Sequence, residues 1–325
     1  MQSTKKALDI VVVGELNADL IFTGLPGLPE MGSCKLARDM EFTLGSASAI
    51  FASNCAKLGM KVGFISKIGN DFVGEFVRDR LIEGNVDCSF IMKDDHEKTG
   101  VCVSLSFPDD YAMASYAGVR ETMTIEDIDF DYLKTAGHLH LSSYYLQTGM
   151  ISGCAELFKV AKESGMTTSL DPDSDATGNW DDSIFNVLRY VDVFMPNAHE
   201  AMSISGTKDL RNAAEKLAST VKTVVIKNGS EGVVAKNGAT MIAANAFDTE
   251  VVDTTGAGDS FNAGFIFQYL RKAPLAKCLV WGNACAAIST TKRGGTTAFP
   301  EMEEVNDYLC ERKQEQEQMI HVLKG

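Results

Sequence analysis

The chain has 325 residues, of which 45% are hydrophobic, and a formal net charge of −14. This length allows one large α/β domain, alone or with a small accessory unit, whereas the negative charge argues against nucleic acid or an anionic membrane as partner, because phosphate groups would be repelled over most of the protein. The eight cysteines include no CxxC pair, which is typical of reduced thiols used in packing. The apolar run at 10–13 is too short for a signal peptide or a membrane span, so we expect a cytoplasmic protein.

Segments rich in β-branched residues alternate with helical patterns along most of the chain, which is typical of a mostly parallel sheet with helices on both faces. In chain order, the predicted strands are 9–14, 61–66, 137–141, 167–170, 192–195, 222–227 and 232–236, and the predicted helices lie near 45–58, 71–84, 150–164, 208–220, 259–271 and 275–291. We assign these elements to a three-layer α/β/α main domain of residues 1–15, 44–87 and 118–325. The tail from Glu301 to Gly325, rich in Glu, Gln and Lys, predicts a solvated helix that frays at its end.

Two segments, 16–43 and 88–117, interrupt this alternation with short strands and with turn signals at Pro26-Gly27 and Pro108-Asp109-Asp110. Both segments are inserted between strand and helix units, so we predict one small β-layer over the C-terminal edge of the main sheet. A lid is the functional interpretation of this layer, and an edge sheet that forms a homodimer is the structural one. Both interpretations remain open.

The segment 253–265, DTTGAGDSFNAGF, combines a glycine turn with the start of a helix. Phe261, Phe265 and Tyr269 recur at every fourth position, so they share one helical face and the helix begins around Asp259. The small residues 256–258 and the free amides of the first turn favour an anion hole for a phosphoryl group, one that contains no lysine. In this turn Asp259 is suited to accept the proton of an attacking hydroxyl, although Asp is also favoured at a helix start by the dipole alone.

The two common nucleotide-binding fingerprints are absent from the sequence. The Gly-Ala-Gly run lacks the third glycine of the dinucleotide motif, because Phe261 occupies that position, and no GxxxxGK[ST] occurs. The segment instead resembles the signature D-T-x-G-A-G-D-x-F of the ribokinase/PfkB family of carbohydrate kinases, and the resemblance spans roughly residues 9–300. It implies a ribokinase-like α/β/α fold with a β lid and ATP-dependent phosphorylation of a hydroxyl on a small sugar or sugar-like molecule.

The resemblance also implies roles for individual residues. The catalytic base corresponds to Asp259, and the anion hole to the amides of Gly256, Ala257 and Gly258. Near the N-terminus, Asn17 and Asp19 follow the first strand and correspond to residues that bind sugar hydroxyls. A carboxylate and an amide at i and i+2 can both reach one polyol, whereas the alternative role of this pair is turn formation.

The turn Gly45-Ser46 before the first long helix is similar to the sugar-binding Gly-Gly turn of the family. Ser46 replaces the second glycine, and Ile50 stands where many sugar kinases have an Asn that contacts the sugar. One polar contact is therefore missing, and the acceptor is expected to be less hydroxylated than ribose or to be held differently.

Asn197 and Glu200 match the N-x-x-E motif of the family, directly after the strand ending at Met195. Because they are three positions apart on a starting helix, both side chains can organise a hydrated Mg²⁺ that bridges the phosphates of ATP. The alternative is an ordinary capping box, in which the Asn caps the helix and the Glu returns to its backbone. Either role uses the same spacing.

The remaining nucleotide-side residues are implied by the resemblance alone. Lys227, Gly229 and Gly232 match a K-x-G-x-x-G turn beside the nucleotide, for which a plain hairpin turn is the alternative, and Asn283 is placed near adenine by its position. A monovalent cation, K⁺, is expected at a loop near the anion hole, with these matching residues: Asp253, Thr255, Ser289 and Gly294.

The sequence also allows predictions for several polar residues outside these motifs. Asp173 and Asp175 replace an Asn and an Arg of the family pattern, which removes a positive charge. His138 and His140 alternate on a predicted strand, so that one would face a helix layer, and we interpret both as hydrogen-bonded core residues. Arg120 either contacts substrate or phosphate or is a solvated arginine.

The predicted function is therefore that of a carbohydrate kinase, with two alternatives. The acceptor could be a nucleoside, because Asn17 and Asp19 suit a ribose ring and Ile50 leaves room for an apolar base. The chain could also be a non-catalytic relative that binds a sugar or a nucleotide. The intact Asp259 and anion hole speak against that second alternative.

Overall fold

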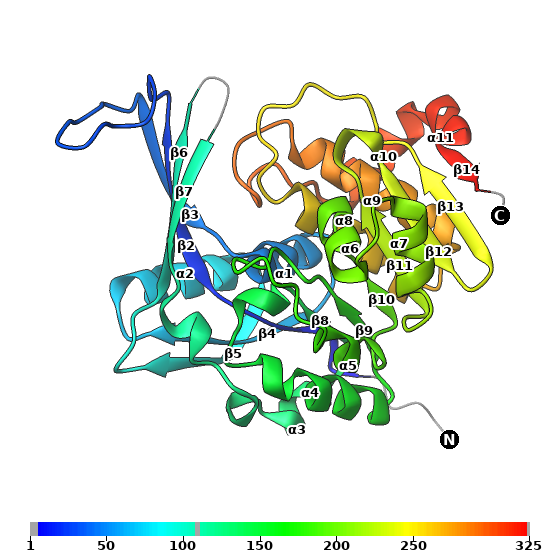
Figure 1. Cartoon of the computed structure of the whole chain (residues 1–325), viewed down its shortest axis with the longest axis horizontal. Coiled ribbons are helices and arrows are strands. Elements are labelled where there is room, and N and C mark those ends of the chain that lie inside the picture. The colour runs from blue at the N-terminus through cyan, green and yellow to red at the C-terminus, as the bar shows by residue number, and fades with distance from the viewer. Residues whose placement is uncertain (1–5, 108–110, 324–325) are drawn as a thin grey trace.

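The computed structural model describes residues 6–107 and 111–323, and its strands form a large and a small sheet (Figure 1). The large sheet consists of β1 (Leu8–Val13), β4 (Val62–Gly69), β5 (Val86–Asp94), β8 (Ala136–Leu141), β9 (Thr167–Leu170), β10 (Val193–Phe194), β11 (Thr223–Lys227), β12 (Val233–Asn237), β13 (Thr240–Ala244) and β14 (Ile320–Val322). The small sheet consists of β2 (Asn17–Thr23), β3 (Asp39–Leu44), β6 (Gly100–Ser106) and β7 (Tyr111–Tyr116).

The large sheet is parallel over most of its width. Its strand order is β14-β13-β12-β11-β10-β9-β8-β1-β4-β5. All neighbours from β11 to β5 pair in parallel, whereas the pairs β11·β12, β12·β13 and β13·β14 are antiparallel. The small sheet has the order β3-β2-β6-β7 and stands beside one end of the large sheet (Figure 1).

Helices cover both faces of the large sheet, as the alternation of strands and helices predicts. They are α1 (Ala47–Lys57), α2 (Phe72–Glu83), α3 (Phe130–Leu133), α4 (Ile151–Glu163), α5 (Ile184–Leu188), α6 (Ala198–Ser205), α7 (Leu210–Leu217), α8 (Ala257–Leu270), α9 (Leu275–Ser289), α10 (Met302–Glu311) and α11 (Lys313–Met319). Among the helices in the described ranges, none has the length and apolar character that a membrane crossing requires.

The core has two layers because successive side chains of a strand point to opposite faces. On β1, Ile10 and Val12 pack into the layer formed with α1, α2, α8 and α9, whereas Val11 and Val13 pack into the layer formed with α4 to α7. All four side chains are fully buried. The predicted three-layer α/β/α fold with a mostly parallel sheet and a small second sheet is confirmed.

The assignment of 88–117 to the small sheet needs a correction. Residues 88–94 belong to β5, which pairs in parallel with β4 and forms an edge of the large sheet. The small sheet takes only β6 and β7 from this segment. The turn expected at Pro108-Asp109-Asp110 lies outside the described residues.

The tail is helical and mostly exposed from 302 to 319, as predicted, but the expectation that its end frays was wrong as far as Leu323. Two helices, α10 and α11, are followed by β14, which pairs with β13 and extends the large sheet. Val305, Leu309 and Met319 are buried in the core. Because these apolar residues are few and widely spaced, the charged composition of the tail conceals its packing face. Its last two residues, 324–325, lie outside the described ranges.

Candidate active site

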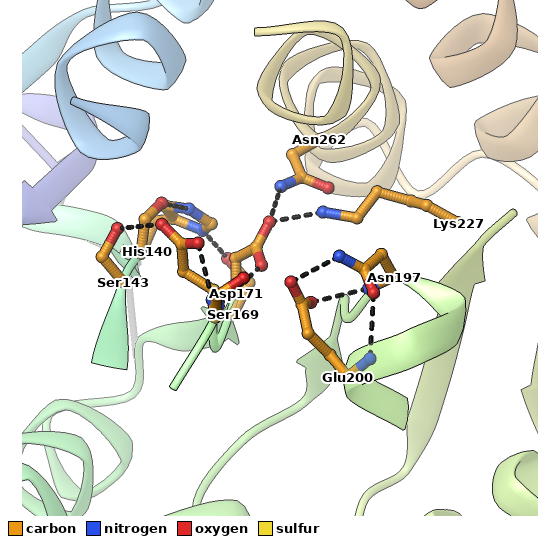
Figure 2. A network of polar contacts seen from close by, with 11 residues as sticks. His140, Ser143, Ser169, Asp171, Asn197, Glu200, Lys227 and Asn262 are labelled. Atoms are coloured by element: carbon orange, nitrogen blue, oxygen red, sulfur yellow. Dashed lines mark hydrogen bonds and ion pairs between the residues drawn. The ribbon is translucent and has the colours of Figure 1, made fainter. Parts of the chain in front are cut away.

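Polar side chains converge where the parallel strands of the large sheet end. Glu15 follows β1, Ser143 follows β8, Asp171 follows β9 and Asn197 follows β10, while Lys227 is the last residue of β11. The carboxyl ends of parallel strands form the edge at which α/β proteins bind their ligands. Figure 2 shows the Lys227 ammonium and the Asn262 side-chain amide, which comes from α8, at the same Asp171 oxygen.

The glycine turn before α8 forms the predicted anion hole in part. Gly256 adopts the left-handed conformation with φ 69°, and α8 begins at Ala257, two residues before the expected start. The Ala257 amide donates to the Thr254 carbonyl at 3.1 Å, whereas the amides of Gly256, Gly258 and Asp259 donate to no acceptor in the described part of the chain. Three free N–H groups therefore remain at the positive end of the helix dipole.

A lysine lies beside this turn, contrary to the expectation of an anion hole without one. A Cβ added to Gly258 would lie 3.5 Å from Lys227 Nζ. This ammonium donates to Asp171 Oδ2 at 2.5 Å, and Asn262 Nδ2 donates to the same oxygen at 2.5 Å. Burial lowers the pKa of Lys227, but the nearby carboxylates of Asp171 and Glu200 outweigh it, so that the pKa is raised. The lysine is therefore a fixed positive charge next to the free amides.

Asp259 lies in the first turn of α8 and is partly buried. Burial, together with the carboxylates of Asp171, Asp173 and Glu15, raises its pKa well above the ordinary value, against the opposing charge of Lys227. A carboxylate with a raised pKa is a better proton acceptor than an ordinary exposed aspartate. Its role as catalytic base stays a prediction.

Asn17, Asp19 and Gly45 come together as the sequence predicts. Asn17 Nδ2 donates to Asp19 Oδ1 at 3.1 Å. A Cβ added to Gly45 would lie 2.1 Å from Asp19 Oδ1 and 2.6 Å from Asn17 Nδ2, so any larger residue would force these two side chains to move. Burial raises the pKa of Asp19 to about 6, although the hydrogen bond from Asn17 opposes the shift.

A cavity of about 930 Å³ lies between the small sheet and the loop that precedes the glycine turn. Its lining includes Asp19 from β2 and the loop 252–255. Arg293 also lines it and crosses between the two parts, with Nη1 3.7 Å from Asp39 Oδ2 and 3.4 Å from Thr23 Oγ1. The cavity therefore reaches Asp19 of the predicted acceptor site and the loop that leads into the glycine turn, whereas residues 256–259 are not part of its lining.

Ser46 serves mainly as a helix cap. Its hydroxyl oxygen accepts the Ala49 amide hydrogen at 3.2 Å, and the hydroxyl lies 2.6 Å from the Glu15 carbonyl and 3.0 Å from Glu15 Oε1. Ser48 and Ser143 also donate to the Glu15 carboxylate, at 2.7 and 2.8 Å. Glu15 was missed at the sequence level, although a charged residue two positions after the apolar run 10–13 was a usable signal.

Glu15 and Asp173 share one hydroxyl group. Ser143 Oγ lies 2.8 Å from Glu15 Oε1 and 2.9 Å from Asp173 Oδ2. A serine hydroxyl carries one proton and can donate to only one of them at a time, so both contacts are satisfied when the other carboxyl is protonated and donates in return. Burial is the main reason that the pKa of each carboxyl is raised. This part of the site therefore favours a carboxyl pair that holds a proton.

Asn197 and Glu200 form a complete capping box. Asn197 Oδ1 accepts from the Glu200 amide at 2.9 Å, the Asn197 amide donates to Glu200 Oε2 at 2.8 Å, and the two side chains are hydrogen-bonded at 2.5 Å (Figure 2). Burial and the neighbouring Asp171 raise the pKa of Glu200. Within residues 6–107 and 111–323, no group of three His, Cys, Asp or Glu side chains is arranged to hold a metal ion. That Asn197 and Glu200 bind Mg²⁺ through water molecules stays a prediction.

The predicted nucleotide-side residues lie on a turn and on α9. Gly229 and Gly232 have positive φ values of 56° and 86°, and a Cβ on Gly232 would lie 2.1 Å from the Ala244 carbonyl oxygen. The turn therefore needs glycine for backbone reasons alone. Asn283 Nδ2 donates to the Asn245 carbonyl at 2.7 Å, which fixes its side chain beside the end of β13. Contacts of these residues with a nucleotide stay predictions.

Three of the four residues predicted for a monovalent cation are linked. Asp253 Oδ1 accepts from the Thr255 amide at 2.9 Å, and Asp253 Oδ2 accepts from the Gly294 amide at 2.9 Å. Ser289 is buried on α9, where its hydroxyl donates to the Ala286 carbonyl at 2.8 Å. The cation itself stays a prediction.

The two histidines of β8 are buried core residues, as expected, and His140 faces a helix layer, because its ring stacks on Phe51 of α1 with 3.7 Å between the ring centroids. Because positions i and i+2 of a strand share a face, His138 Nε2 and His140 Nδ1 both lie 2.7 Å from Ser169 Oγ. Burial lowers the pKa of His138 to about 3 and that of His140 well below the ordinary value of histidine. Arg120 lies in a short 3-10 helix, Gly118–Glu121, and its Nε is buried without a hydrogen-bond partner in the described ranges.

Two residues of the cluster, Asp171 and Asn262, were not assigned a role from the sequence. Asn262 is three positions after Asp259 on α8, so the helical spacing alone placed it on the same side. No local pattern pairs Asp171 with Asn262, since 91 residues separate them. Their contact depends on the order of the strands.

Comparisons with known proteins agree with this architecture. Residues 7–302 match the family described as pfkB family carbohydrate kinase. A ribokinase from Haemophilus influenzae is 29% identical over 311 residues, which cover 92% of this chain and 98% of the relative. A 2-dehydro-3-deoxygluconokinase from Bacillus subtilis is 27% identical over 332 residues, which cover 98% of this chain and 99% of the relative.

The fold is also similar to that of solved structures. An E. coli structure described as ribokinase II in complex with ATP and Mg²⁺ has a TM-score of 0.83 at 22% identity, and the match covers 94% of this chain and 99% of that chain. The family match covers nearly the whole length, as the signature around Asp259 predicts. The chain therefore belongs to the pfkB family of carbohydrate kinases.

Proposed function

We propose that this carbohydrate kinase transfers the γ-phosphoryl group of ATP to a hydroxyl of a small sugar or sugar-like acceptor. The observation that carries the proposal is the set of free amides at the start of α8, with Asp259 in the same helical turn and Lys227 beside it. Free N–H groups and a fixed cation stabilise the charge that develops on a transferring phosphoryl group. A neighbouring carboxylate with a raised pKa supplies the base.

In this mechanism the acceptor occupies the cavity between the small sheet and the loop 252–255 and extends toward the adjoining glycine turn. Asn17 and Asp19 bind its hydroxyls, and the reacting hydroxyl faces Asp259. The acceptor oxygen forms a bond to the γ-phosphorus while the bond from that phosphorus to the bridging oxygen of ADP breaks, and Asp259 takes the hydroxyl proton. The amides of Gly256 and Gly258 face the equatorial oxygens.

The nucleotide side of the proposal uses residues that the turn and helices already hold in place. We place ATP along Lys227, Gly229, Gly232 and Asn283, in keeping with the ATP and Mg²⁺ in the E. coli structure of the same fold. Asn197 and Glu200 would hold Mg²⁺ through water, and the ion would neutralise phosphate charge. For K⁺, the proposed residues are Asp253, Thr255, Ser289 and Gly294.

The small sheet is proposed to act as a lid and as the contact surface of a homodimer. Its strands and the loop after β2 expose large apolar side chains, namely Met31, Leu36, Met40 and Met113. Exposed apolar groups of this kind are typical of protein contacts. The molar mass in solution, measured by light scattering for the wild type and for Met40→Glu, tests the dimer; a monomeric wild type would contradict it. The cytoplasmic location stays a prediction from the sequence.

Release of ADP from MgATP, measured against a panel of free sugars, sugar acids and nucleosides, tests the proposed reaction. Turnover with a sugar or sugar acid supports the proposal. Turnover with nucleosides alone selects the nucleoside kinase instead. The absence of turnover with every acceptor, in a protein whose melting temperature still rises with a sugar or nucleotide, selects the non-catalytic alternative.

A further inference from the structure

One face of α1 contacts the region around the anion hole. The helix begins beside the predicted acceptor turn, at the Ser46 cap, and ends at Lys57. Ile50, Asn54 and Lys57 are four and three positions apart, so they lie on one side of the helix. All three contact the loop 294–299, and two of them also reach the start of α8.

Ile50 packs between two glycines. A Cβ added to Gly295 would lie 2.6 Å from Ile50 Cδ1, and a Cβ added to Gly256 would lie 3.1 Å from Ile50 Cγ2. The Ile50 side chain is 4% exposed. The residue that replaces the polar sugar contact of many sugar kinases therefore points at the anion-hole turn in this structure.

Asn54 joins the same three elements one helical turn later. Its Nδ2 donates to Ser260 Oγ at 3.2 Å and to the Gly295 carbonyl at 3.4 Å. The side chain is fully buried. Its amide therefore ties α1 to both the loop and α8.

Lys57 completes the face with a charge. Its Nζ donates to the Thr296 carbonyl at 2.6 Å and to the Phe299 carbonyl at 3.4 Å. No carboxylate lies within ion-pair distance of Lys57 in the part of the chain that the structure describes. Hydrogen bonds from a charged donor are stronger than neutral ones, so this partly buried ammonium holds the loop carbonyls in place.

The loop held by Lys57 supports the anion hole from behind. Gly295 Cα would lie only 2.7 Å from a Cβ on Gly256, so the two backbones are in close contact. The Gly294 amide donates to Asp253 Oδ2 at 2.9 Å, and Asp253 Oδ1 accepts from the Thr255 amide. A displacement of the loop would therefore be transmitted to the turn that presents the free amides.

We propose that Lys57 is a positioning residue for phosphoryl transfer, and that with Asn54 and Ile50 it sets the anion hole through the loop 294–299. This inference rests on the proposed phosphotransferase function. Because α1 starts at the acceptor turn, the same helix links the acceptor site and the phosphoryl site. Lys57 touches neither substrate, so its effect is on geometry and appears in kcat rather than in acceptor binding.

The test compares Lys57→Met with Lys57→Arg in the full chain, with Lys61→Met as the matched control because Lys61 is an exposed lysine just beyond α1. With the acceptor that the screen identifies, we expect Lys57→Met to lower kcat roughly tenfold, since small misplacements at a reacting centre have large kinetic effects. The KM of the acceptor should change by less than about twofold, because α1 keeps its own cap. Lys57→Arg should restore most of kcat, and Lys61→Met should behave as the wild type.

The outcomes separate this inference from the proposed function. A wild type that phosphorylates no acceptor contradicts the proposed function and, with it, this inference. If the wild type is active and folded Lys57→Met has the same kcat, the inference alone is contradicted. Lys57 would then have only a structural role, even if the variant melts at a lower temperature. Circular dichroism verifies folding, and if Lys57→Met does not fold, Asn54→Ala is measured in the same way, with the same kcat loss expected.

Discussion

The two halves of the candidate site are built from different chemistry. On the phosphoryl side, Asp171 is paired with Lys227 and Asn262, and three amides at the start of α8 have no acceptor among the described residues. On the acceptor side, Asp19, Glu15 and Asp173 have only hydroxyl or amide partners among the described residues. The phosphoryl side therefore suits an anion, whereas the acceptor side suits hydroxyl groups that donate hydrogen bonds to carboxylates.

The sharpest test of this contrast is removal of the proposed base. Asp259→Asn should lower kcat by roughly 10²–10⁴-fold, the range for loss of a general base, because the amide cannot take the hydroxyl proton. Binding of a non-hydrolysable ATP analogue, measured by calorimetry, should stay close to that of the wild type. The exposed Asp182→Asn serves as control. Near wild-type turnover of Asp259→Asn would remove the residue from its proposed role.

The next largest effect is expected at the charged pair of the phosphoryl side. Lys227→Met should lower kcat by roughly 10²–10³-fold and should destabilise the protein by about 3–5 kcal/mol, because Asp171 is left buried without its cation. Urea unfolding and steady-state kinetics measure the two effects. The double variant Lys227→Met/Asp171→Asn should regain stability but not activity.

The exposed Lys222→Met is the matched control for this pair. If the double variant recovered activity as well as stability, the lysine would be a structural partner of Asp171 rather than part of the anion site.

On the acceptor side, one added methyl group should weaken acceptor binding without affecting ATP binding. Gly45→Ala places a Cβ 2.1 Å from Asp19 Oδ1, which must then move. We expect the acceptor KM to rise roughly tenfold, equivalent to about 1.4 kcal/mol, with the KM of ATP unchanged. Gly137→Ala is the control, because its added Cβ has no neighbour closer than 3.4 Å. Equal changes in both KM values would mean that the two halves are not independent.

The smallest expected effect concerns the shared proton. The pKa of Asp173 is raised in the folded state by burial, with Asp171 adding to the shift. The folded protein therefore binds more protons than the unfolded chain, and stability should fall as the pH rises from the usual aspartate range through the raised pKa. Asp173→Asn removes that penalty, so its melting temperature should exceed that of the wild type at pH 8 by more than at pH 4. A constant difference across this range would contradict the shared proton.

Sequence reasoning was most successful where the signal is local. The glycine turn at 256–258, the helix after it and the pairing of Asn17 with Asp19 each depend on neighbours within a few residues, and the structure has all three. It was least successful at the sheet edges. β5 and β14 form the two edges of the large sheet, and neither has a local sequence pattern that predicts which strand it pairs with.

The amino-acid sequence by itself determined the alternation of strands and helices, the family and the turn that leaves amides free, because periodicity and glycine conformation are properties of short segments. Only the tertiary structure decided that Lys227 reaches that turn, that Ser143 joins Glu15 to Asp173, and that Ile50 faces the anion hole. The residues that these contacts join are between 30 and 245 positions apart in the sequence, and several of them follow the ends of different strands. Which strand ends meet depends on the order of strands in the sheet, and buried groups then take the partners that the order brings within hydrogen-bond distance.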